Sequence, residues 1–429
     1  MKLEKNLMNS KKEQTSSTST KSIKFPPHML TRRAFLVNFM HMLGLGLIIK
    51  PSLLHARAKA PTLKSKRRNH SHKSNIIIRV LIYQGTAIPK SFPIAVVKEG
   101  IRYRDKLFPP INSSYGRTVE VTIDKEAPIV YKKNAYEGKF IVVKKKNQYI
   151  IVNELELDKY LTGVVKKEIS PSWHHNAIRT QAIAARSYAY NYINTDSKAL
   201  YHVGATVAHQ VFGGTANVPA SIEKGVSATQ DIILIDKFDK QPVQSFFHAC
   251  CGGITEKAEN VWSSEKSLRY FKNIRCPHCK THPLYRWERK FSTQYIHNAL
   301  KKLKIDSVKA IRVGARTGSK RIHKIFIKAQ HGKHNVTHNL TGNKFRVAIS
   351  PRDIPSTLFS IKQSRKDYNL TGKGFGHGVG LCQWGTKTMA EKGFSAFAIL
   401  DFYYKNCKTI TIAKYTKKYG RKHSKKSLG

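Results

Sequence analysis

The sequence predicts an α+β fold, in which a β-rich domain carries a central pair of helices and is followed by an inserted β-rich subdomain. Apolar residues recur at helical spacing in two neighbouring segments within residues 155–192. Short runs of β-branched and aromatic residues lie on both sides of that stretch. Hydrophobic residues make up 40% of the 429 residues, which is enough for the core of one large domain or two ordinary ones.

Residues 1–60 are predicted to be an export signal or an N-terminal membrane anchor. Arg32 and Arg33 resemble a twin-arginine export motif and precede an apolar run at residues 35–49. At about 15 residues, this run is too short for an ordinary spanning helix. Small residues around Ala58 offer cleavage sites, and without cleavage the segment would remain as an anchor. Both outcomes predict an exported protein of the periplasm or cell envelope. Residues 61–74 are expected to form a basic, flexible linker.

The chain is strongly basic, with 77 Lys and Arg residues against 26 Asp and Glu residues. Such a balance usually indicates nucleic-acid binding. However, the sequence has no zinc-finger spacing, no RNA-recognition aromatic motif and no confined basic helix. The basic residues are spread along the whole chain, which suits a protein that works on or near the anionic polymers of a cell envelope. We therefore do not expect a nucleic-acid partner.

β structure is expected between the linker and the helix pair. Residues 76–82 form an apolar run that predicts a buried strand. Further strands are predicted at residues 94–97, 118–123, 140–143 and 149–152. No chemistry is evident in this region.

The two central helices are separated by a break around Pro171. The apolar stripe of the first helix consists of Leu157, Leu161 and Val164. The next position on that stripe is Glu168, a carboxylate where an apolar residue would be expected. The helix ends there because proline lacks a donor and disfavours helical angles in the residue before it. The second helix begins after Trp173, and its many alanines would let another element approach closely.

Glu168 is the candidate catalytic residue. A carboxyl group on a buried stripe loses hydration, and at the end of a helix it faces the negative end of the dipole. Both effects favour the protonated acid, which is the form that protonates a leaving oxygen. The alternative is a structural ion pair between Glu168 and Arg186 or Lys167.

These segments also carry a family resemblance. The string Leu-Asp-Lys-Tyr-Leu-Thr-Gly-Val-Val at 157–165, then Glu168, Pro171 and Trp173, and the string Ala-Ile-Arg-Thr-Gln-Ala-Ile-Ala-Ala-Arg-Ser-Tyr at 177–188 resemble the signature of the SpoIID/LytB family. This family comprises stage II sporulation protein D and the amidase enhancers. The resemblance spans about residues 75–412 and implies a peptidoglycan-binding protein whose helix pair lines a long substrate cleft.

In the sporulation members, which are lytic transglycosylases, the glutamate matching Glu168 is catalytic. The resemblance therefore implies that Glu168 cleaves peptidoglycan glycan strands to 1,6-anhydro-N-acetylmuramic acid ends, in cell-wall remodelling or division, without a cofactor. Those members act on glycan without stem peptides, which implies a partner N-acetylmuramoyl-L-alanine amidase. The amidase enhancers suggest the alternative, a non-catalytic protein that binds peptidoglycan and activates such an amidase.

Substrate-binding roles are implied for Arg186 and Tyr188 on the second helix, and for His209 and Gln210 in the element Gln-Val-Phe-Gly-Gly. Some family members hold a zinc ion just before this element, through a His-x5-Cys-x4-His-Cys-Gln pattern. This sequence has His202 and His209 but no cysteine between them, so that zinc site is not expected.

A glycine-rich string begins at Gly372 and includes His377, Gln383 and Trp384. Its alternating glycines indicate a backbone that something approaches closely. The three side chains offer a donor, an amide and a flat apolar face, which suit a sugar. The alternative is a glycine-rich core turn with Trp384 simply packed. The string also resembles the family's Gly-His-Gly-x-Gly-x-x-Gln-Trp-Gly signature, which supports a binding role.

Cys276 and Cys279 form a Cys-x2-Cys pair, with His282 three residues later. Such a pair is one half of a metal site, and these three residues are candidates for one. The residues that could complete it are His248, His278 and either Cys250 or Cys251. The two cysteines directly precede a Gly-Gly-x-Thr-Glu turn that is similar to the family's. In an exported protein the alternative is disulfide pairing among these cysteines. No metal is predicted to take part in catalysis.

Residues 284–362 are expected to form the inserted subdomain, with one helix at 294–303. More β structure is expected around this helix, and residues 311–313, 322–327, 341–346 and 356–359 are similar to elements of the family. Helical segments at 387–392 and 397–404 follow, and residues 413–429 form a basic C-terminal tail.

Overall fold

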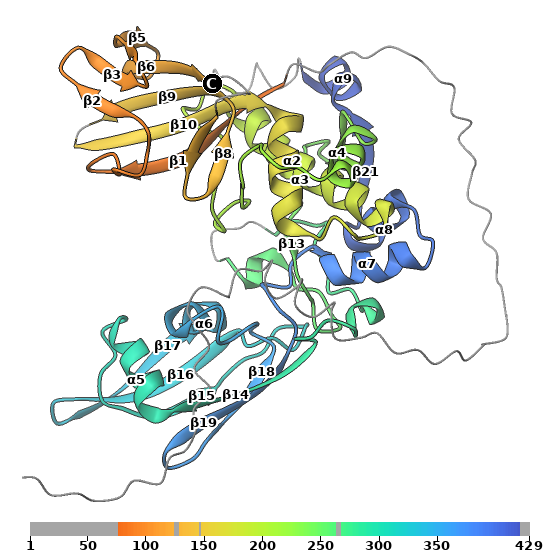
Figure 1. Ribbon diagram of the computed structural model, residues 1–429. Coiled ribbons are helices and arrows are strands. Elements are labelled where there is room, and N and C mark those ends of the chain that lie inside the picture. The colour runs from red at the N-terminus through yellow and green to blue at the C-terminus, as the bar shows by residue number, and fades with distance from the viewer. Residues whose placement is uncertain (1–75, 124–127, 146, 263–266, 421–429) are drawn as a thin grey trace, which may run out of the picture. The chain divides into compact units, whose positions relative to one another are not determined.

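The computed structural model describes residues 76–123, 128–145, 147–262 and 267–420 (Figure 1). The predicted export segment, 1–60, and the basic linker, 61–74, lie outside the described residues. Helices and several sheets alternate along the described chain, so the fold is α+β as the sequence predicts. None of the described helices has the length and apolar character needed to cross a membrane.

The first body of the structure is built on a six-stranded sheet with the order β11-β1-β10-β9-β6-β5. Its strands are β1 (Ile77–Gly85), β5 (Ile111–Ser113), β6 (Gly116–Ile123), β9 (Gly138–Lys145), β10 (Gln148–Glu156) and β11 (Val203–Gly204). Neighbours are antiparallel except for β11, which pairs with β1 in parallel. The strands predicted at 76–82, 118–123, 140–143 and 149–152 are confirmed.

Short strands near this sheet are less visible in the sequence. They form a three-stranded sheet of β2 (Ala95–Val97), β3 (Gly100–Tyr103) and β4 (Lys106–Phe108), and a hairpin of β7 (Ile129–Tyr131) and β8 (Asn134–Tyr136). Only β2, at the predicted residues 94–97, was expected. The others span three or four residues, which is too short for the alternation of side chains to predict a strand.

Both faces of the large sheet are buried. In β9, Phe140 and Val142 belong to the main hydrophobic core, whereas Ile141 and Val143 belong to a smaller cluster with Ile150 and Val152. This division follows from the two-residue period of a strand, which sends successive side chains to opposite faces. The sheet is therefore held on both sides, and its strand β10 leads directly into the first central helix.

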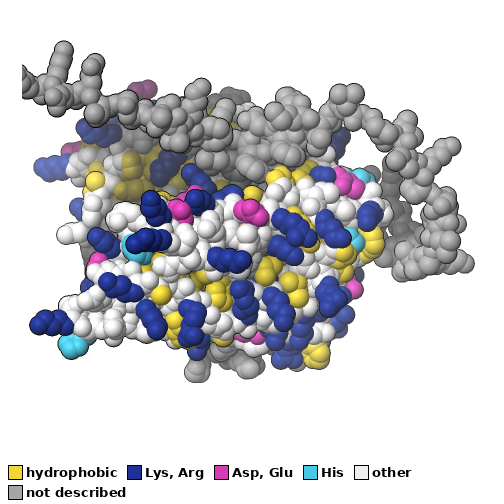
Figure 2. Space-filling view, turned by 90° about the horizontal axis from the view of Figure 1, so that it is seen from below, with side chains coloured by type: hydrophobic (Ala, Val, Ile, Leu, Met, Phe, Trp, Pro, Cys, Tyr) yellow, Lys and Arg dark blue, Asp and Glu magenta, His cyan; other side chains and the backbone are white. Residues whose placement is uncertain are grey.

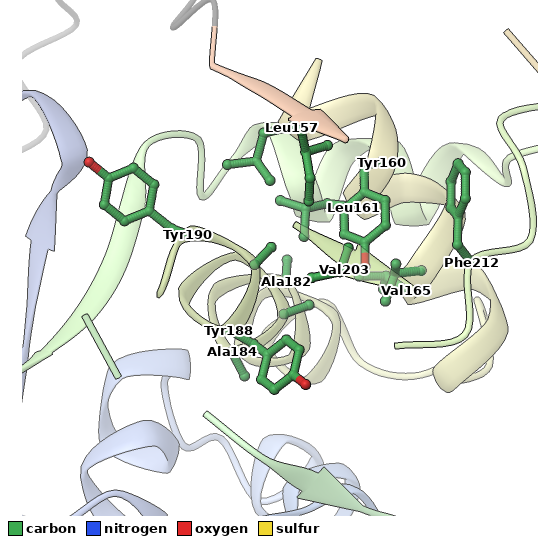
Figure 3. Close-up of a cluster of buried hydrophobic side chains, with 14 of the residues drawn as sticks. Leu157, Tyr160, Leu161, Val165, Ala182, Ala184, Tyr188, Tyr190, Val203 and Phe212 are labelled. Carbon is green, nitrogen blue, oxygen red and sulfur yellow. The ribbon is translucent and has the colours of Figure 1, made fainter. Parts of the chain in front are cut away.

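The central helices are α2 (Leu157–Glu168) and α3 (His175–Thr195). α2 ends at Glu168 because Ile169 takes an extended conformation just before Ser170 and Pro171. α3 begins after His174, whose ring Nδ1 accepts a hydrogen bond from the backbone N–H of Asn176 at 3.2 Å. Figure 3 shows Leu161 of α2 beside Ala182 of α3, and both side chains are fully buried. The alanines allow the close approach that the sequence predicts.

The second body, from β14 to β19, has its own hydrophobic core. It contains one sheet of β14 (Arg286–Ser292), β19 (Asp367–Lys373) and β18 (Phe359–Gln363), and another of β15 (Val308–Val313), β16 (Lys324–His331) and β17 (His334–Thr341). Its helices are α5 (Thr293–Lys301) and α6 (Gly342–Ile349). The expected helix at 294–303 corresponds to α5, and the segments expected at 311–313 and 322–327 correspond to β15 and β16. Residues 342–346 belong to α6, a second helix where only β structure was expected. Strand β19 lies beyond the expected boundary at residue 362.

The C-terminal region returns to the first core. It contains α7 (Gln383–Glu391), α8 (Ala396–Tyr403) and β21 (Cys407–Thr411), which pairs with β12 (Ile232–Asp236) just after α4 (Ala220–Ser227). The expected tail at 413–429 begins with packed structure, because α9 (Ile412–Tyr415) buries Tyr415 against Tyr190 at a ring distance of 5.9 Å. A π-helical turn follows at Thr416–Gly420, and residues 421–429 lie outside the described part.

The basic residues are dispersed on the surface. Figure 2 shows Lys and Arg side chains scattered over the visible face, with few Asp and Glu side chains among them. A scattered excess of positive charge attracts anionic polymers without defining a single groove.

Candidate functional site

Glu168 is the last residue of α2 and lies where the helix stops. Its side chain is buried, with a relative exposure of 7%. The other stripe residues, Leu157, Leu161 and Val164, are buried in the main core beside it, as the helical period predicts. The chain then turns through Ser170 to Trp173, whose backbone N–H donates to the carbonyl of Ser170 at 3.2 Å. The carboxyl group thus sits at the junction between α2 and α3 with a small part of its surface exposed.

Gln383 contacts the Glu168 carboxyl group directly. Its side-chain Nε2 donates a hydrogen bond to Glu168 Oε2 at 3.1 Å, and it lies 3.5 Å from Gln181 Oε1. Gln383 is the first residue of α7, and Gln181 lies on α3, so three helices meet at this carboxyl group. A donated amide hydrogen bond fixes the orientation of the carboxyl group.

Trp384 lies beside this cluster, as the next residue of α7. Its ring centroid is 6.1 Å from that of Trp173 in an edge-to-face arrangement and 4.8 Å from that of His282. Trp384 is half-buried. The Lys387 Nζ lies 5.7 Å from the centroid of the Trp384 ring. The sugar-binding role of Trp384 stays a prediction.

Gln210 forms hydrogen bonds with both central helices. Its Oε1 accepts a hydrogen bond from the Tyr160 hydroxyl at 3.0 Å, and its Nε2 donates to the carbonyl of Ala185 at 3.3 Å. Burial raises the pKa of Tyr160 first, and the charge of nearby Glu168 raises it further, so the phenol stays protonated. Gln210 is itself buried, with a relative exposure of 1%, so its role in this structure is to join α2 to α3 and not to face a ligand.

The glycines after Gln210 explain how this element reaches α2. The backbone N–H of Gly213 donates to the carbonyl of Gly163 at 3.2 Å. A Cβ added at Gly163 would lie 2.4 Å from the carbonyl oxygen of Gly214, so this position of α2 requires glycine. Figure 3 shows Phe212 next to Tyr160, with ring centroids 5.1 Å apart.

Arg186 has a structural role, contrary to the predicted contact with a glycan strand. Its side chain is fully buried and bonds to Asp158 Oδ1 at 3.0 Å. It also donates to the carbonyls of Thr229 at 2.6 Å and Val226 at 3.1 Å. The guanidinium group therefore ties α2 and α3 to the end of α4 and the loop after it, and no part of it is exposed to a ligand.

Tyr188 and His209 lie together with Tyr192. The Tyr188 hydroxyl donates to the Tyr192 hydroxyl at 3.3 Å, and the His209 ring is 5.5 Å from the Tyr192 ring. Tyr188 is buried, whereas Tyr192 and His209 are half-buried. Burial lowers the pKa of His209, so its ring is neutral at neutral pH. Of the two predicted residues, His209 is the one with surface available to a ligand.

The alternating glycines are approached by the protein's own chain. Gly374, Gly376, Gly378 and Gly380 all have positive φ. A Cβ at Gly380 would lie 2.1 Å from the Phe246 carbonyl oxygen, and one at Gly374 would lie 2.7 Å from that of Cys250. Here β13 (Phe247–His248) pairs in parallel with β20 (Leu381–Cys382). The string is thus a packed turn along residues 246–252, as the alternative reading predicted for its glycines.

His377 belongs to this turn. Its Nδ1 accepts from the backbone N–H of Val379 at 3.0 Å, and its Nε2 lies 3.1 Å from the Phe247 carbonyl oxygen. These contacts fix the neutral tautomer with the proton on Nε2. Both ring nitrogens are engaged by backbone, so the predicted donation from His377 to a sugar is not supported by this geometry.

A second buried carboxylate, Glu256, has a structural role. Its oxygens accept hydrogen bonds from the Lys257 backbone and from the side chains of Asn260, Asn273, Thr317 and Ser319. Burial alone would raise its pKa, but hydrogen bonds from Ser319, Thr317 and Asn260 lower it below the usual value. Glu256 therefore stays ionised, joins residues 255–260 to the loop before β16, and is not available as a general acid.

Cys276 and Cys279 lie in a cluster with Cys251 and Cys382, in which all four Sγ atoms are within 4.8 Å of one another. The other candidate, His282, is not in this cluster. Its Nδ1 accepts from the Leu284 backbone N–H at 2.9 Å, and burial lowers its pKa to about 4. Spacing along the sequence suggested His282 because it is close to Cys279, but the fold brings Cys382 instead.

The long substrate cleft stays a prediction. One hollow in the described part is lined by Glu256, Arg321 and His377, and another by Arg79, Tyr115 and Lys145. Neither is lined by Glu168. Along the chain, Glu168 is followed within three residues by the half-buried Ser170 and Pro171, and its partner Gln383 is followed by the half-buried Trp384.

Comparison with known proteins identifies the relatives of this chain. An uncharacterized protein of Brachyspira hyodysenteriae is 32% identical over 285 residues, which cover 66% of this chain and 74% of that protein. Stage II sporulation protein D of Bacillus subtilis is 27% identical over 283 residues, covering 62% and 78%. Residues 145–235 match the SpoIID family, described as stage II sporulation protein. The chain belongs to the SpoIID/LytB family.

Two further matches bear on the site. The amidase enhancer of Bacillus subtilis is 28% identical over 288 residues, which cover 57% of this chain and 39% of that protein. Residues 255–380 match a domain of unknown function, DUF8618, and this segment includes the whole second body. The SpoIID match contains Glu168, Gln181 and Gln210, whereas Gln383 and Trp384 lie beyond both matched segments.

Two residues near Glu168, Gln181 and Tyr160, were not predicted as functional. Gln181 is buried on α3, and its Nε2 has no hydrogen-bond partner among the described residues. Tyr160 is buried on α2 and takes part through Gln210. The sequence signal for Gln181 is its position on an otherwise alanine-rich helix face. A buried side-chain amide there must be hydrogen-bonded to another group, which indicates a specific role. Tyr160 carries no such signal, because a tyrosine beside the apolar stripe of a helix is predicted to be an ordinary residue of the hydrophobic core.

Proposed function

We propose that this protein cleaves the glycan strands of peptidoglycan by lytic transglycosylation, with Glu168 as the catalytic acid and base. The observation that carries the proposal is the buried carboxyl group at the end of α2, held by the Gln383 amide at 3.1 Å. Membership in the family of stage II sporulation protein D supports a substrate in the cell wall.

In the proposed reaction, Glu168 first donates its proton to the glycosidic oxygen that follows N-acetylmuramic acid. The bond from C1 to that oxygen breaks, and the leaving sugar keeps the proton as its hydroxyl. The Glu168 carboxylate then takes the proton from the C6 hydroxyl of the same N-acetylmuramic acid, and O6 bonds to C1 to close the 1,6-anhydro ring. Glu168 ends protonated and no water is consumed, so a single acid-base residue completes the cycle.

A single carboxylate suits this reaction better than hydrolysis. Ordinary glycosidases use two carboxyl groups, one as the acid and the other as a nucleophile or as the base for water. Glu256, the other buried glutamate among the described residues, has its oxygens occupied by hydrogen bonds and is not available for the second role. The C6 hydroxyl of the substrate replaces the water, and with it the need for a second carboxylate.

The proposed working environment is outside the cytoplasm. Residues 1–60 would direct export and remain as an anchor unless cleaved, which would place the domain in the periplasm or cell envelope. The substrate would be glycan from which an N-acetylmuramoyl-L-alanine amidase has removed the stem peptides. The dispersed positive surface charge would favour association with anionic envelope polymers.

The second candidate is a non-catalytic enhancer that binds peptidoglycan and activates a partner amidase. The name of the amidase enhancer relative is the observation that favours it. In that function Glu168 would be a structural carboxyl group, and its replacement would leave the activation of an amidase unchanged.

The test replaces Glu168 by glutamine, which keeps the shape and hydrogen-bonding capacity but cannot give or take a proton. We expect formation of anhydro ends on amidase-treated glycan to fall by about 10³-fold or more, with glycan retention in a pull-down nearly unchanged. The matched control is Glu156→Gln, at the start of the same helix, which should cleave at the wild-type rate. A Glu168→Gln protein that cuts as fast as wild type would make Glu168 structural. Wild type that cuts nothing but speeds an added amidase would favour the enhancer.

A further inference from the structure

Four cysteines from three separate segments meet in the core. Cys251 follows β13, Cys276 and Cys279 frame the 3-10 turn Pro277–Cys279, and Cys382 ends β20 directly before α7. Their Sγ atoms all lie within 4.8 Å of one another, and each residue has a relative exposure of 1% or less. The remaining cysteines, Cys250 and Cys407, are outside this group.

The spacing of the sulfur atoms matches a tetrahedral metal site. Zinc binds thiolate sulfur at about 2.3 Å, so four sulfurs around one ion lie about 3.8 Å apart. The Sγ atoms of Cys251 and Cys279 are 3.4 Å apart, far beyond the roughly 2.05 Å of a disulfide bond. The Cys-x2-Cys turn supplies one half of a four-cysteine zinc site, and Cys251 and Cys382, from two other segments, supply the other half.

Neighbouring groups are arranged to support thiolates. The backbone N–H of Cys251 donates to the Sγ of Cys382 at 3.3 Å, and the Tyr403 hydroxyl lies 3.1 Å from the Sγ of Cys276. Gly385 makes room for this contact, since a Cβ there would lie 1.9 Å from the Tyr403 hydroxyl oxygen. Hydrogen bonds to ligating groups orient them and tune the metal.

A buried positive charge lies next to the cluster. Arg321 has a relative exposure of 1%, and its guanidinium donates to the carbonyls of Cys251 at 2.7 Å and Ile254 at 2.9 Å. Zinc with four thiolates carries a net charge of about −2, which is costly in a core unless it is compensated. Arg321, held against the Cys251 backbone, provides part of that compensation.

We propose that Cys251, Cys276, Cys279 and Cys382 bind one structural zinc ion. With four protein ligands the ion has no open position, so it takes no part in the cleavage chemistry. It instead ties the chain around residue 251 and the 276–279 turn to the start of α7. Cys382 precedes Gln383, the residue that holds Glu168, so zinc fixes the end of α7 that contacts the proposed catalytic group.

The experiment measures metal and thiols in the full chain, purified without an affinity tag and dialysed against buffer free of metal. Elemental analysis should find about one zinc per chain, in wild type and in the controls Cys250→Ser and Cys407→Ser. The double variant Cys276→Ser/Cys279→Ser should lose zinc at least about tenfold, since two of the four ligands are removed. Zinc retained by the double variant would overturn the proposal.

Thiol counting keeps the test decisive if the double variant does not fold. Wild type denatured with a chelator and without reductant should show all six of its cysteines as reactive thiols. Replacement of zinc by cobalt should also give the intense visible absorption of a tetrahedral cobalt–thiolate site. Wild type without zinc and with only two reactive thiols would show disulfides instead, and iron in place of zinc would equally contradict the assignment. These readouts do not depend on glycan cleavage, so they can fail or succeed independently of the proposed function.

Discussion

The Glu168 carboxyl group is held by a residue from the far end of the chain. Gln383 follows Glu168 by 215 positions, yet its amide lies 3.1 Å from Glu168 Oε2. A carboxyl group that must point at a glycosidic oxygen benefits from such support, because small errors of orientation reduce the rate strongly. In the proposed reaction Gln383 is a positioning residue, and its effect should appear in turnover more than in binding.

We predict that Gln383→Ala lowers kcat for anhydro-product formation by about 10- to 100-fold and changes KM by less than about twofold. A hydrogen bond to a charged group contributes about 1.5–3 kcal/mol, which corresponds to that loss if it is used to orient Glu168. Steady-state kinetics on peptide-free glycan measure both constants.

The matched control for this variant is Gln230→Ala, an exposed glutamine after α4, which should keep the wild-type kcat. Thermal unfolding of both variants shows whether the fold persists. A rise in KM with unchanged kcat would mean that Gln383 binds the strand and does not position Glu168.

Arg186 shows what the sequence does not reveal about a buried charge. The family resemblance implies that this residue of α3 binds the substrate, yet its side chain is fully buried. The partner that makes burial possible, Asp158, lies 28 positions earlier on α2. Arginine is rarely buried without such a partner, and the sequence does not show which acid it meets.

At the scale of elements, the helix pair follows from local rules and the glycine string does not. Helical spacing and Pro171 predict both helices and the end of α2. The glycines from Gly374 to Gly380 indicate a close approach, but the approaching group is the segment 246–252 and the side chain of Arg321. Only the long-range pairing of β13 with β20 reveals this.

The Glu256 hydrogen bonds predict a pH-dependent contribution to stability. Because the folded-state pKa lies below the ordinary value of 4.5, the contribution is present above pH 4.5 and is lost as pH falls through the folded pKa. We expect Glu256→Gln to lower the free energy of unfolding at pH 7 by about 2–4 kcal/mol. Denaturant unfolding should show the difference from wild type shrinking below pH 4.5.

The control for Glu256 is Glu223→Gln, an exposed glutamate on α4, which should change stability by less than about 0.5 kcal/mol. A gap between wild type and Glu256→Gln that is equally large at pH 7 and pH 3 would contradict the account. It would mean that shape, and not the ionised carboxylate, matters at this position.

For the whole molecule, the sequence predicts the α+β class, five strands of the first body, the central helices and α5. The segments expected at 311–313, 322–327, 387–392 and 397–404 correspond to β15, β16, α7 and α8. The shorter strands escape prediction because three or four residues carry too little pattern, and α6 escapes because its Thr341 cap lies at the end of a strand. The residues of the candidate site also divide into those that the sequence predicts and those that it does not. Glu168 and Trp384 follow from pattern and resemblance, whereas Gln181 and the fourth cysteine need contacts between distant segments.

The central claim is that the glycan strand is cut without water, by one acid-base residue. The most direct measurement is mass spectrometry of the ends that wild type produces from peptide-free glycan in water labelled with heavy oxygen. Lytic transglycosylation predicts N-acetylmuramic acid ends that are lighter than reducing ends by one water and carry no label. Reducing ends that have taken up the heavy oxygen would show hydrolysis and contradict the mechanism, and intact strands would contradict the enzymatic function itself.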